Sequence, residues 1–312
     1  MQADYRAVTF SEYGDPEVLQ VVERPLPDPG AGEVRLVVRA AGVNPLDWKI
    51  RSGAAASFLP VGFPVVPGGD VAGVVDAVGL DVTGFAVGDE VLGSIGFGGY
   101  AEAVVVGAEM LAKKPASVPW ETASALPVAA NTALHALDEL KLREDETIVI
   151  DGAAGGVGTV AVQLARLRGA QVVGTAREAN HTYLRSLGAT PVEYGAGLAD
   201  RVRSVAPQGV DAVLDVSGRG SLPGLIEVAG GPDRVVTIAD FSAAELGVRM
   251  VSADAEGAVR RIGVVAALAA EGKLTVPIAA TYPLEEAAEA HRVSEQGHVR
   301  GKLVILPSGK AD

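Results

Sequence analysis

A glycine-rich turn that joins an apolar run to a helical pattern constrains this 312-residue chain most strongly. The apolar run covers residues 147–150, and its unbroken hydrophobicity is typical of a strand buried on both faces. Residues 157–168 then repeat apolar side chains at helical spacing. The turn between them contains Gly152, Gly155, Gly156 and Gly158. A strand, a turn and a helix in this order predict the start of a β-α-β unit.

Strand-like and helix-like segments continue to alternate after this unit. Strands are expected at residues 171–174, 210–215, 234–239 and 247–251, and helices at 181–187, 199–206, 257–271 and 284–296. Repeated β-α-β units with right-handed crossovers produce a doubly wound parallel sheet. We therefore predict an α/β fold for this part of the chain.

The first 120 residues have a different character. Short apolar runs at 34–41, 71–78, 90–92 and 101–106 alternate with glycine and proline, which favours an irregular β-rich region. The run Lys302–Leu306 has no parallel strand left to join, so we return it to this region. A chain of this length favours two domains. The predicted domains are residues 1–120 with 259–312, and residues 121–258.

Composition excludes several classes of function. The chain has 39 acidic and 26 basic side chains, and its net charge of −13 opposes binding to nucleic acid or to anionic lipid. It has no cysteine, which excludes disulfides, iron–sulfur clusters, thiolate nucleophiles and cysteine-ligated zinc. The uncharged stretches at 52–69 and 122–137 contain proline and are shorter than the ~20 residues of a membrane span. With no secretory signal visible either, we expect a cytoplasmic protein.

The glycine turn is suited to a dinucleotide. Gly155 allows backbone amides to approach a pyrophosphate, and Gly158 allows the helix to pack close to the strand. The helix N-terminus adds unpaired N–H groups and a partial positive charge. The first glycine of the usual G-x-G-x-x-G pattern is replaced by Ala153, and a turn without any ligand is the alternative. The expected contacts are Ala154, Gly155, Gly156 and Val157.

The end of the second strand indicates which dinucleotide binds. An NAD enzyme usually has Asp or Glu there, whereas this chain has Thr175, Ala176 and Arg177. Arg177 can form charge-assisted hydrogen bonds to a 2′-phosphate, which favours NADPH over NADH. The alternative is that Arg177 is a solvated surface residue neutralised by Glu178.

Several segments together resemble one enzyme family. They are residues 40–53 (AAGVNPLDWKIRSG), 67–75, 88–91, 98–102, 125–133, the glycine turn, and 300–304. In this order, over essentially the whole chain, they are similar to the zinc-independent, zeta-crystallin-like quinone oxidoreductases of the medium-chain dehydrogenase/reductase superfamily. The resemblance implies a GroES-like β-rich domain, a Rossmann domain and a C-terminal return to the first domain.

The resemblance also gives the missing cysteine a mechanistic meaning. Zinc-dependent relatives ligate the metal with Cys where Asn44 stands and with His where Gly69 stands, and the four histidines are scattered, so we expect no metal site. Without a Lewis acid, oxidation of an alcohol is disfavoured. The resemblance thus implies hydride transfer from NADPH to an acceptor with its own electron sink, a quinone or another α,β-unsaturated carbonyl.

The resemblance implies roles for single residues. The position of Asn44 faces the nicotinamide and the substrate, whereas Lys49 replaces a tyrosine and either stabilises an enolate or is simply solvated. Asp47 is expected to tie its own loop. Expected cofactor contacts are Asn44, Thr132, Thr175, Arg177, Tyr194 near the 2′-phosphate, Ser217 and Gly218, Ile238, Arg300 and Lys302. Expected residues of the acceptor pocket are Asn131, Phe97, Phe241 and the tract 62–66, although Phe241 can equally be core or lid.

The sequence leaves two alternative functions and also predicts an oligomeric state. One is an enoyl-thioester or enone reductase, and the other is a non-catalytic, crystallin-like NADPH-binding protein. Residues 247–251 resemble the edge strand with which relatives pair across a two-fold axis, so we expect a homodimer.

Overall fold

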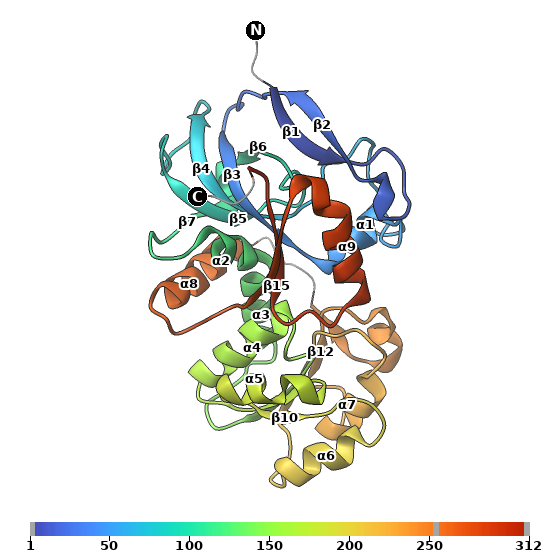
Figure 1. Cartoon of the computed structure of the whole chain (residues 1–312). Helices are drawn as coiled ribbons and strands as arrows, with labels where there is room; N and C mark the ends of the chain where they lie inside the picture. The colour runs from blue at the N-terminus through green and yellow to red at the C-terminus, as the bar shows by residue number, and fades with distance from the viewer. Residues whose placement is uncertain (1–3, 252–255, 309–312) are drawn as a thin grey trace. The chain divides into compact units, whose positions relative to one another are not determined.

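The computed structural model describes residues 4–251 and 256–308 (Figure 1). They form two compact units, residues 4–128 with 257–308, and residues 129–251 with 256. The first unit is rich in β-strands and the second has a parallel sheet between helices, which confirms the predicted fold class. Helix α2 (Trp120–Ala125) contacts β3, β4 and β15 and therefore belongs to the first unit, whereas the sequence boundary placed it in the second.

The first unit contains a two-stranded and a seven-stranded sheet. β1 (Asp4–Thr9) and β2 (Gln20–Pro25) form the small antiparallel sheet. The large sheet has the order β14-β15-β3-β4-β5-β7, with β6 also paired to β3. Its strands are β3 (Glu33–Val43), β4 (Asp70–Val78), β5 (Glu90–Ser94), β6 (Ala103–Gly107), β7 (Leu111–Lys113), β14 (Ile278–Pro283) and β15 (Lys302–Leu306). The α-helices of the first unit are α1 (Pro45–Arg51), α2, α8 (Ala258–Ala270) and α9 (Ala287–Gln296).

The C-terminal strand β15 returns to the first unit, as the sequence predicts. It is dark red in Figure 1 and pairs antiparallel with the blue β3, with Leu303 opposite Val43. It also has a parallel neighbour, β14, which the sequence did not reveal because that segment is only partly buried along its length. This pairing brings the start of β15 beside the end of β3, where Asn44 follows.

The second unit is a six-stranded parallel sheet of order β10-β9-β8-β11-β12-β13. The strands are β8 (Thr147–Asp151), β9 (Gln171–Thr175), β10 (Thr190–Val192), β11 (Ala212–Asp215), β12 (Val235–Thr237) and β13 (Arg249–Met250). The helices are α3 (Pro127–Glu139), which begins at the end of the first unit, α4 (Gly156–Leu167), α5 (His181–Ser186), α6 (Leu198–Val205) and α7 (Leu222–Ala229). The chain order reverses between β8 and β11, and such a reversal is where open α/β sheets bind ligands.

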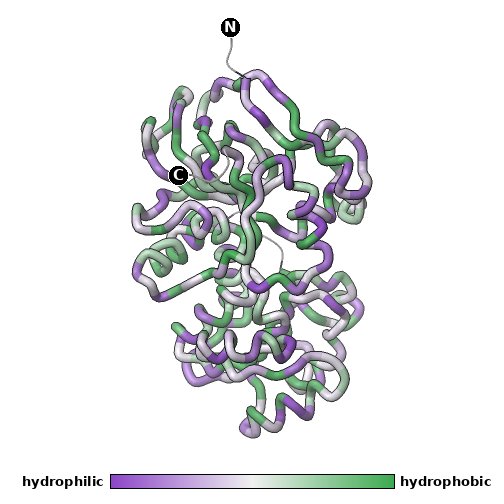
Figure 2. Tube along the Cα trace, in the orientation of Figure 1, coloured by the Kyte–Doolittle hydropathy of each residue, from purple (hydrophilic) through white to green (hydrophobic). Residues whose placement is uncertain are grey.

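Burial explains why the strands of this parallel sheet have continuous apolar sequences. Val149, Val173, Val213 and Val235 come from four neighbouring strands and are almost completely buried in one core cluster. Figure 2 shows hydrophobic segments in green and hydrophilic segments in purple along the chain. The core is thus the region where β-branched residues from adjacent parallel strands pack together.

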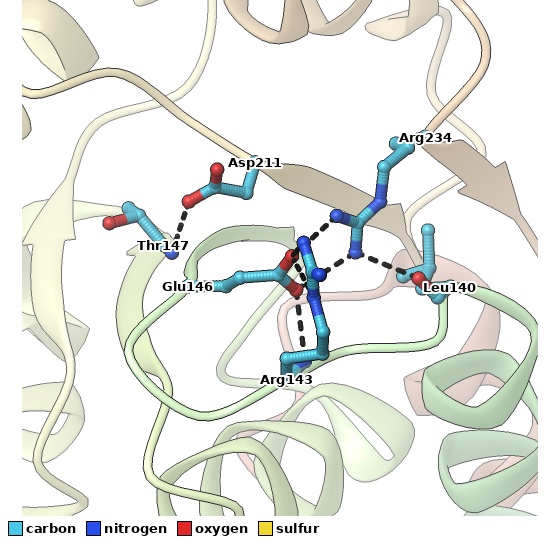
Figure 3. A network of polar contacts seen from close by, with 6 residues as sticks. All are labelled: Leu140, Arg143, Glu146, Thr147, Asp211 and Arg234. Carbon is cyan, nitrogen blue, oxygen red and sulfur yellow. Dashed lines mark hydrogen bonds and ion pairs between the residues drawn. The ribbon is translucent and has the colours of Figure 1, made fainter.

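A charged cluster fixes the amino end of β8 (Figure 3). The Glu146 carboxylate accepts hydrogen bonds from the guanidinium groups of Arg234, at 2.6 and 2.9 Å, and Arg143, at 2.8 and 2.9 Å. Arg234 also donates to the Leu140 carbonyl at 2.8 Å. The Arg234 guanidinium is the main reason that the pKa of Glu146 falls to about 2. The cluster therefore joins the start of β8 to the start of β12.

Candidate functional site

The glycine turn of the second unit leaves a helix N-terminus open. The N–H groups of Gly152 and Ala153 donate to Thr175 Oγ1 and to its carbonyl, both at 3.1 Å, so the turn is tied to the end of β9. Helix α4 follows Gly155, and no side chain caps its first N–H groups. A Cβ on Gly158 would lie 2.3 Å from the Gly152 carbonyl oxygen, so only glycine allows this close packing. These features suit a bound pyrophosphate.

A buried carboxylate organises the strand ends beside this turn. Asp151 ends β8, is 2% exposed, and accepts a hydrogen bond from Thr175 Oγ1 at the end of β9. Ser217 Oγ and Ser221 Oγ also donate to it, at 2.5 and 2.7 Å. Asp151 therefore links the ends of β8 and β9 to the loop that follows β11.

A second carboxylate shapes the next loop. Asp215 ends β11 and accepts the N–H groups of Ser217 and Gly218, at 2.8 and 3.0 Å, and the Thr237 hydroxyl at 2.8 Å. Burial is the main reason that the pKa of Asp215 is raised. Gly218 has φ +59°, and a Cβ there would lie 2.6 Å from the Ala239 carbonyl oxygen. The loop thus requires glycine at this position.

Sequence reasoning selected Thr175, Ser217 and Gly218 at these strand ends but missed the groups that hold them. The missed residues are Asp151, Asp215 and Thr237. Each is a polar residue that ends an apolar, buried strand. Because the carboxyl ends of parallel strands meet at one edge of a sheet, this pattern was a usable signal.

Arg177 and Tyr194 follow neighbouring strands. Val192 of β10 lies opposite Thr175 of β9, so the two residues occupy equivalent positions after the paired strands. Both are exposed, and the Arg177 guanidinium has no hydrogen bond or ion pair with any residue in the described ranges 4–251 and 256–308. The Arg201 guanidinium donates to four carbonyl groups of the segment 193–196, which fixes the backbone that carries Tyr194. An exposed cation and a phenol at this edge suit a phosphate.

The candidate site of the first unit is built around Asn44. Its side-chain N–H donates to Asp70 Oδ2 at 2.9 Å, and Lys302 Nζ donates to its Oδ1 at 2.5 Å. Lys302 Nζ also lies 3.6 Å from the Asp70 carboxylate. All three side chains are buried. Burial raises the pKa of Asp70, and the ammonium of Lys302 opposes this rise.

Asp47 holds the backbone of the same site. Its Oδ2 accepts the N–H of Asn44 at 2.8 Å and the hydroxyl of Tyr100 at 3.1 Å, so it ties the start of α1, as expected. Burial, opposed by the hydrogen bond from Asn44, raises the pKa of Asp47 to about 6. Lys49, one turn along α1, lies 5.7 Å from the centre of the Trp48 ring instead of joining this network.

The first unit also contains a hollow of about 730 Å³. Its lining includes Phe97 and most of the tract 62–66, which the sequence assigned to the acceptor pocket. Tyr5 and Arg24 of the small sheet and the segment 103–105 complete the main walls. The structure therefore brings these two predicted pocket elements together within one unit.

The remaining predicted residues occupy separate places. Asn131 and Thr132 are buried on α3, and Ile238 is half-buried after β12, where its N–H donates to the Asp215 carbonyl. Phe241 is 63% exposed, so it is not a core residue. Arg300 is exposed. Lys302, which is expected to contact the cofactor, is 5% exposed and contacts Asn44.

Comparison with known proteins identifies the family. Residues 30–116 match the alcohol dehydrogenase GroES-like domain, and residues 187–305 match the zinc-binding dehydrogenase family. The chloroplastic quinone oxidoreductase QR1 of Triphysaria versicolor is 35% identical over 97% of this chain and 98% of its own length. The chain is a member of the quinone oxidoreductase family. This family belongs to the medium-chain dehydrogenase/reductase superfamily, and the member described here is an oxidoreductase with an implied nicotinamide cofactor.

Solved structures agree with this membership. The quinone oxidoreductase of Coxiella burnetii is 30% identical, with a TM-score of 0.84 over 98% of this chain and all of that chain. A structure described as an NAD-dependent alcohol dehydrogenase is 32% identical, with a TM-score of 0.87 over 97% of this chain and 99% of that chain. Within the residues that the structure describes, no helix has the length and apolar character needed to span a bilayer.

Zinc, which one matched family name mentions, does not suit the residues of this chain. The carbonyl oxygen of Asn44 is already bonded to the Lys302 ammonium, and Gly69 has no side chain to offer. A Cβ on Gly69 would lie 3.2 Å from the Gly96 carbonyl oxygen, so little space exists there for a ligating side chain. In the residues that the structure describes, no three His, Cys, Asp or Glu side chains are grouped to hold a metal ion.

Proposed function

We propose that this chain reduces a quinone, or another activated α,β-unsaturated carbonyl, with NADPH and without zinc. The observation that carries the proposal is the Lys302–Asn44–Asp70 contact. It puts an ammonium ion and a carboxylate on the two ends of the Asn44 amide, at the position where zinc-dependent relatives have a metal ligand. Such a site offers hydrogen-bond donors instead of a Lewis acid.

The orientation of the Asn44 amide follows from its two charged neighbours. Lys302 is only a donor, so it fixes the amide oxygen, and the Asp70 carboxylate is an acceptor, so it fixes the amide nitrogen. One of the two amide hydrogens then has no partner among the residues 4–251 and 256–308. We infer that this hydrogen is donated to the oxygen of the acceptor, where negative charge develops during reduction.

Lys302 strengthens this donor. A cation bonded to an amide oxygen draws electron density from the nitrogen, and in a buried site this polarisation is weakly screened. Lys302 is then a positioning residue that acts through Asn44. Lys49, a half-buried residue, stays a second candidate for stabilising an enolate, because its ammonium has no acidic partner in the described part of the chain.

The residues of the second unit fit an NADPH molecule. The open N-terminus of α4, with Ala154, Gly155, Gly156 and Val157, suits the pyrophosphate, and the exposed Arg177 and Tyr194 suit the 2′-phosphate. Toward the nicotinamide we propose Thr132, Ser217 and Ile238, with Arg300 as a further contact. When bound, the nicotinamide supplies the hydride from its C4 atom.

A panel of acceptors tests the proposal and its alternatives. The purified protein is supplied with NADPH and either quinones or enones and enoyl thioesters, and NADPH oxidation is followed. Turnover is expected with quinones. Faster turnover with enones or enoyl thioesters would instead support the alternative function of an enoyl-thioester or enone reductase. Tight NADPH binding without turnover on either set would support the non-catalytic, crystallin-like alternative.

We also propose that the protein is a cytoplasmic homodimer. The strand β13 forms one edge of the six-stranded sheet, and both of its residues are exposed. An exposed edge strand presents unpaired backbone groups that a second copy can pair with.

A further inference from the structure

The hollow in the first unit has the size and the walls of a small-molecule site. Its volume of about 730 Å³ lies within the usual range of ligand pockets. Most of the lining is apolar and comes from the segment 60–66, Phe97 and the segment 103–105. A hollow with these walls suits the ring system or chain of a hydrophobic molecule.

Main-chain hydrogen bonds fix the walls. Phe10 and Val65 exchange two backbone hydrogen bonds, at 2.9 and 3.0 Å, and Gly98 N–H donates to the Val66 carbonyl at 2.9 Å. At Pro27, another lining residue, the Arg35 guanidinium donates to the backbone carbonyl at 3.0 Å. The hollow is therefore preformed, and a ligand does not have to order it.

The same segments continue into the Asn44 site. Val66 precedes Asp70 by a few residues, and Asp70 pairs with Ser94 across β4 and β5. The next residue, Ile95, donates its N–H to the Gly69 carbonyl at 2.7 Å, just before Phe97. Backbone pairing thus ties the chain segments that carry Val66 and Phe97 to the segment that carries Asp70.

One cation on the wall lacks a counter-ion. Arg24 lies opposite Tyr5 in the β1–β2 pair, is half-buried, and has no ion pair with any residue of the described ranges. Other arginines of the same unit are paired, for example Arg6 with Glu102 and Arg35 with Asp76. In a chain of net charge −13, a half-buried arginine without a carboxylate beside an apolar hollow is a candidate anion site.

We propose that the hollow binds an acceptor whose apolar body carries an anionic group, a carboxylate or a sulfonate, and that the Arg24 guanidinium and the Tyr5 hydroxyl hold this group. The inference rests on the proposed function, because it names the class of acceptor that the same enzyme prefers. The apolar walls hold the body of the acceptor by burial of its surface, and Arg24 selects its charged end.

Two matched acceptors test this proposal. A naphthoquinone and its ring-sulfonated form share the reducible ring and differ by one anionic group. In Arg24→Gln, KM for the sulfonated quinone is expected to rise about 10-fold, as for the loss of one charge-assisted hydrogen bond, while KM for the neutral quinone stays within about 2-fold. Arg39→Gln is the matched control, because it removes the same charge from an exposed residue of β3 that does not line the hollow.

A binding measurement separates this proposal from the proposed function. Naphthalene sulfonate cannot be reduced, so its affinity is measured by tryptophan fluorescence or calorimetry without any turnover. About 10-fold weaker binding to Arg24→Gln than to the wild-type protein and to Arg39→Gln supports the anion site even if no quinone is reduced. Equal affinities for all three proteins, or equal changes of KM for both quinones, would overturn it.

Discussion

Lys302 Nζ donates a hydrogen bond of 2.5 Å to Asn44 Oδ1, although 258 residues separate the two in sequence. The contact exists because β15 pairs with the end of β3. It gives the C-terminal strand a chemical role as well as a structural one. The chain cannot complete the Asn44 site without its last strand.

Replacing Lys302 with Met is expected to lower kcat by about 10- to 100-fold, because Asn44 loses the cation that polarises and orients its amide. KM for NADPH is expected to change little, since Lys302 is buried against Asn44. Steady-state kinetics with a quinone measure both constants. Lys302→Arg serves as the conservative variant and should restore part of kcat.

The opposite pattern would contradict this role. If Lys302→Met raised KM for NADPH and left kcat unchanged, Lys302 would be a cofactor contact, as the sequence alone predicted. The melting temperature of each variant separates a loss of folding from a loss of catalysis.

Arg177→Ala is expected to weaken NADPH binding by about 10- to 100-fold and to leave NADH binding almost unchanged, because only NADPH carries the 2′-phosphate. Calorimetric titration of both dinucleotides measures this difference. Arg185→Ala is the control, since Arg185 is a similarly exposed arginine on α5. A wild-type protein that prefers NADH would refute the assignment.

The sequence predicted the architecture better than the details of the site. The glycine turn and the alternation of apolar runs were sufficient for the parallel sheet, because strands buried on both faces leave a strong pattern. The partner of Lys302 was not predictable, because it depends on the register between β15 and β3, which no local pattern records. Asp151 and Asp215 end buried apolar strands, a pattern that marks them as candidates, but the hydroxyl groups that they bind lie on other strands and could not be predicted from that pattern.

Glu146→Gln is expected to lower the free energy of unfolding at neutral pH by about 1–3 kcal/mol, since two guanidinium groups lose their carboxylate. The folded-state pKa of Glu146 is about 2, below its ordinary value of 4.5. Its contribution is therefore complete above about pH 4.5 and is lost as the pH falls toward 2. Urea unfolding at several pH values measures this. A variant with the same stability as the wild type at pH 7 would show that the cluster of Figure 3 is not stabilising.

His291 is expected to make the fold sensitive to mild acid. Its ring is fully buried edge-on to Tyr100, and neither nitrogen has a hydrogen-bond partner in the described residues. Burial, assisted by the charge of Arg51, lowers the pKa of His291 to about 3. Between pH 6.5 and 3 the unfolded chain therefore binds a proton that the folded chain does not, so stability decreases on acidification.

The His291→Phe variant isolates this effect. Between pH 7.5 and pH 5, protonation linked to His291 should lower the free energy of unfolding of the wild type by about 2 kcal/mol. The variant lacks this contribution, so its free energy of unfolding should fall by about 2 kcal/mol less than that of the wild type. Urea titrations at both pH values give the difference. Parallel pH profiles for the two proteins would contradict a neutral, buried His291.

The proposed dimer is tested by light scattering at micromolar concentration. A mass of two chains is expected for the wild type. Met250→Lys, which puts a charge on the exposed edge strand β13, is expected to give a monomer. A wild-type monomer would refute the dimer, and a dimeric Met250→Lys would place the interface elsewhere.

The most direct test of the central claim is the rate of NADPH oxidation by the wild-type protein with a quinone after exhaustive treatment with a metal chelator. We predict sustained turnover at the rate of the untreated protein, with NADPH favoured over NADH. Loss of turnover on chelation with recovery on adding zinc, or oxidation of alcohols in place of quinone reduction, would contradict the account.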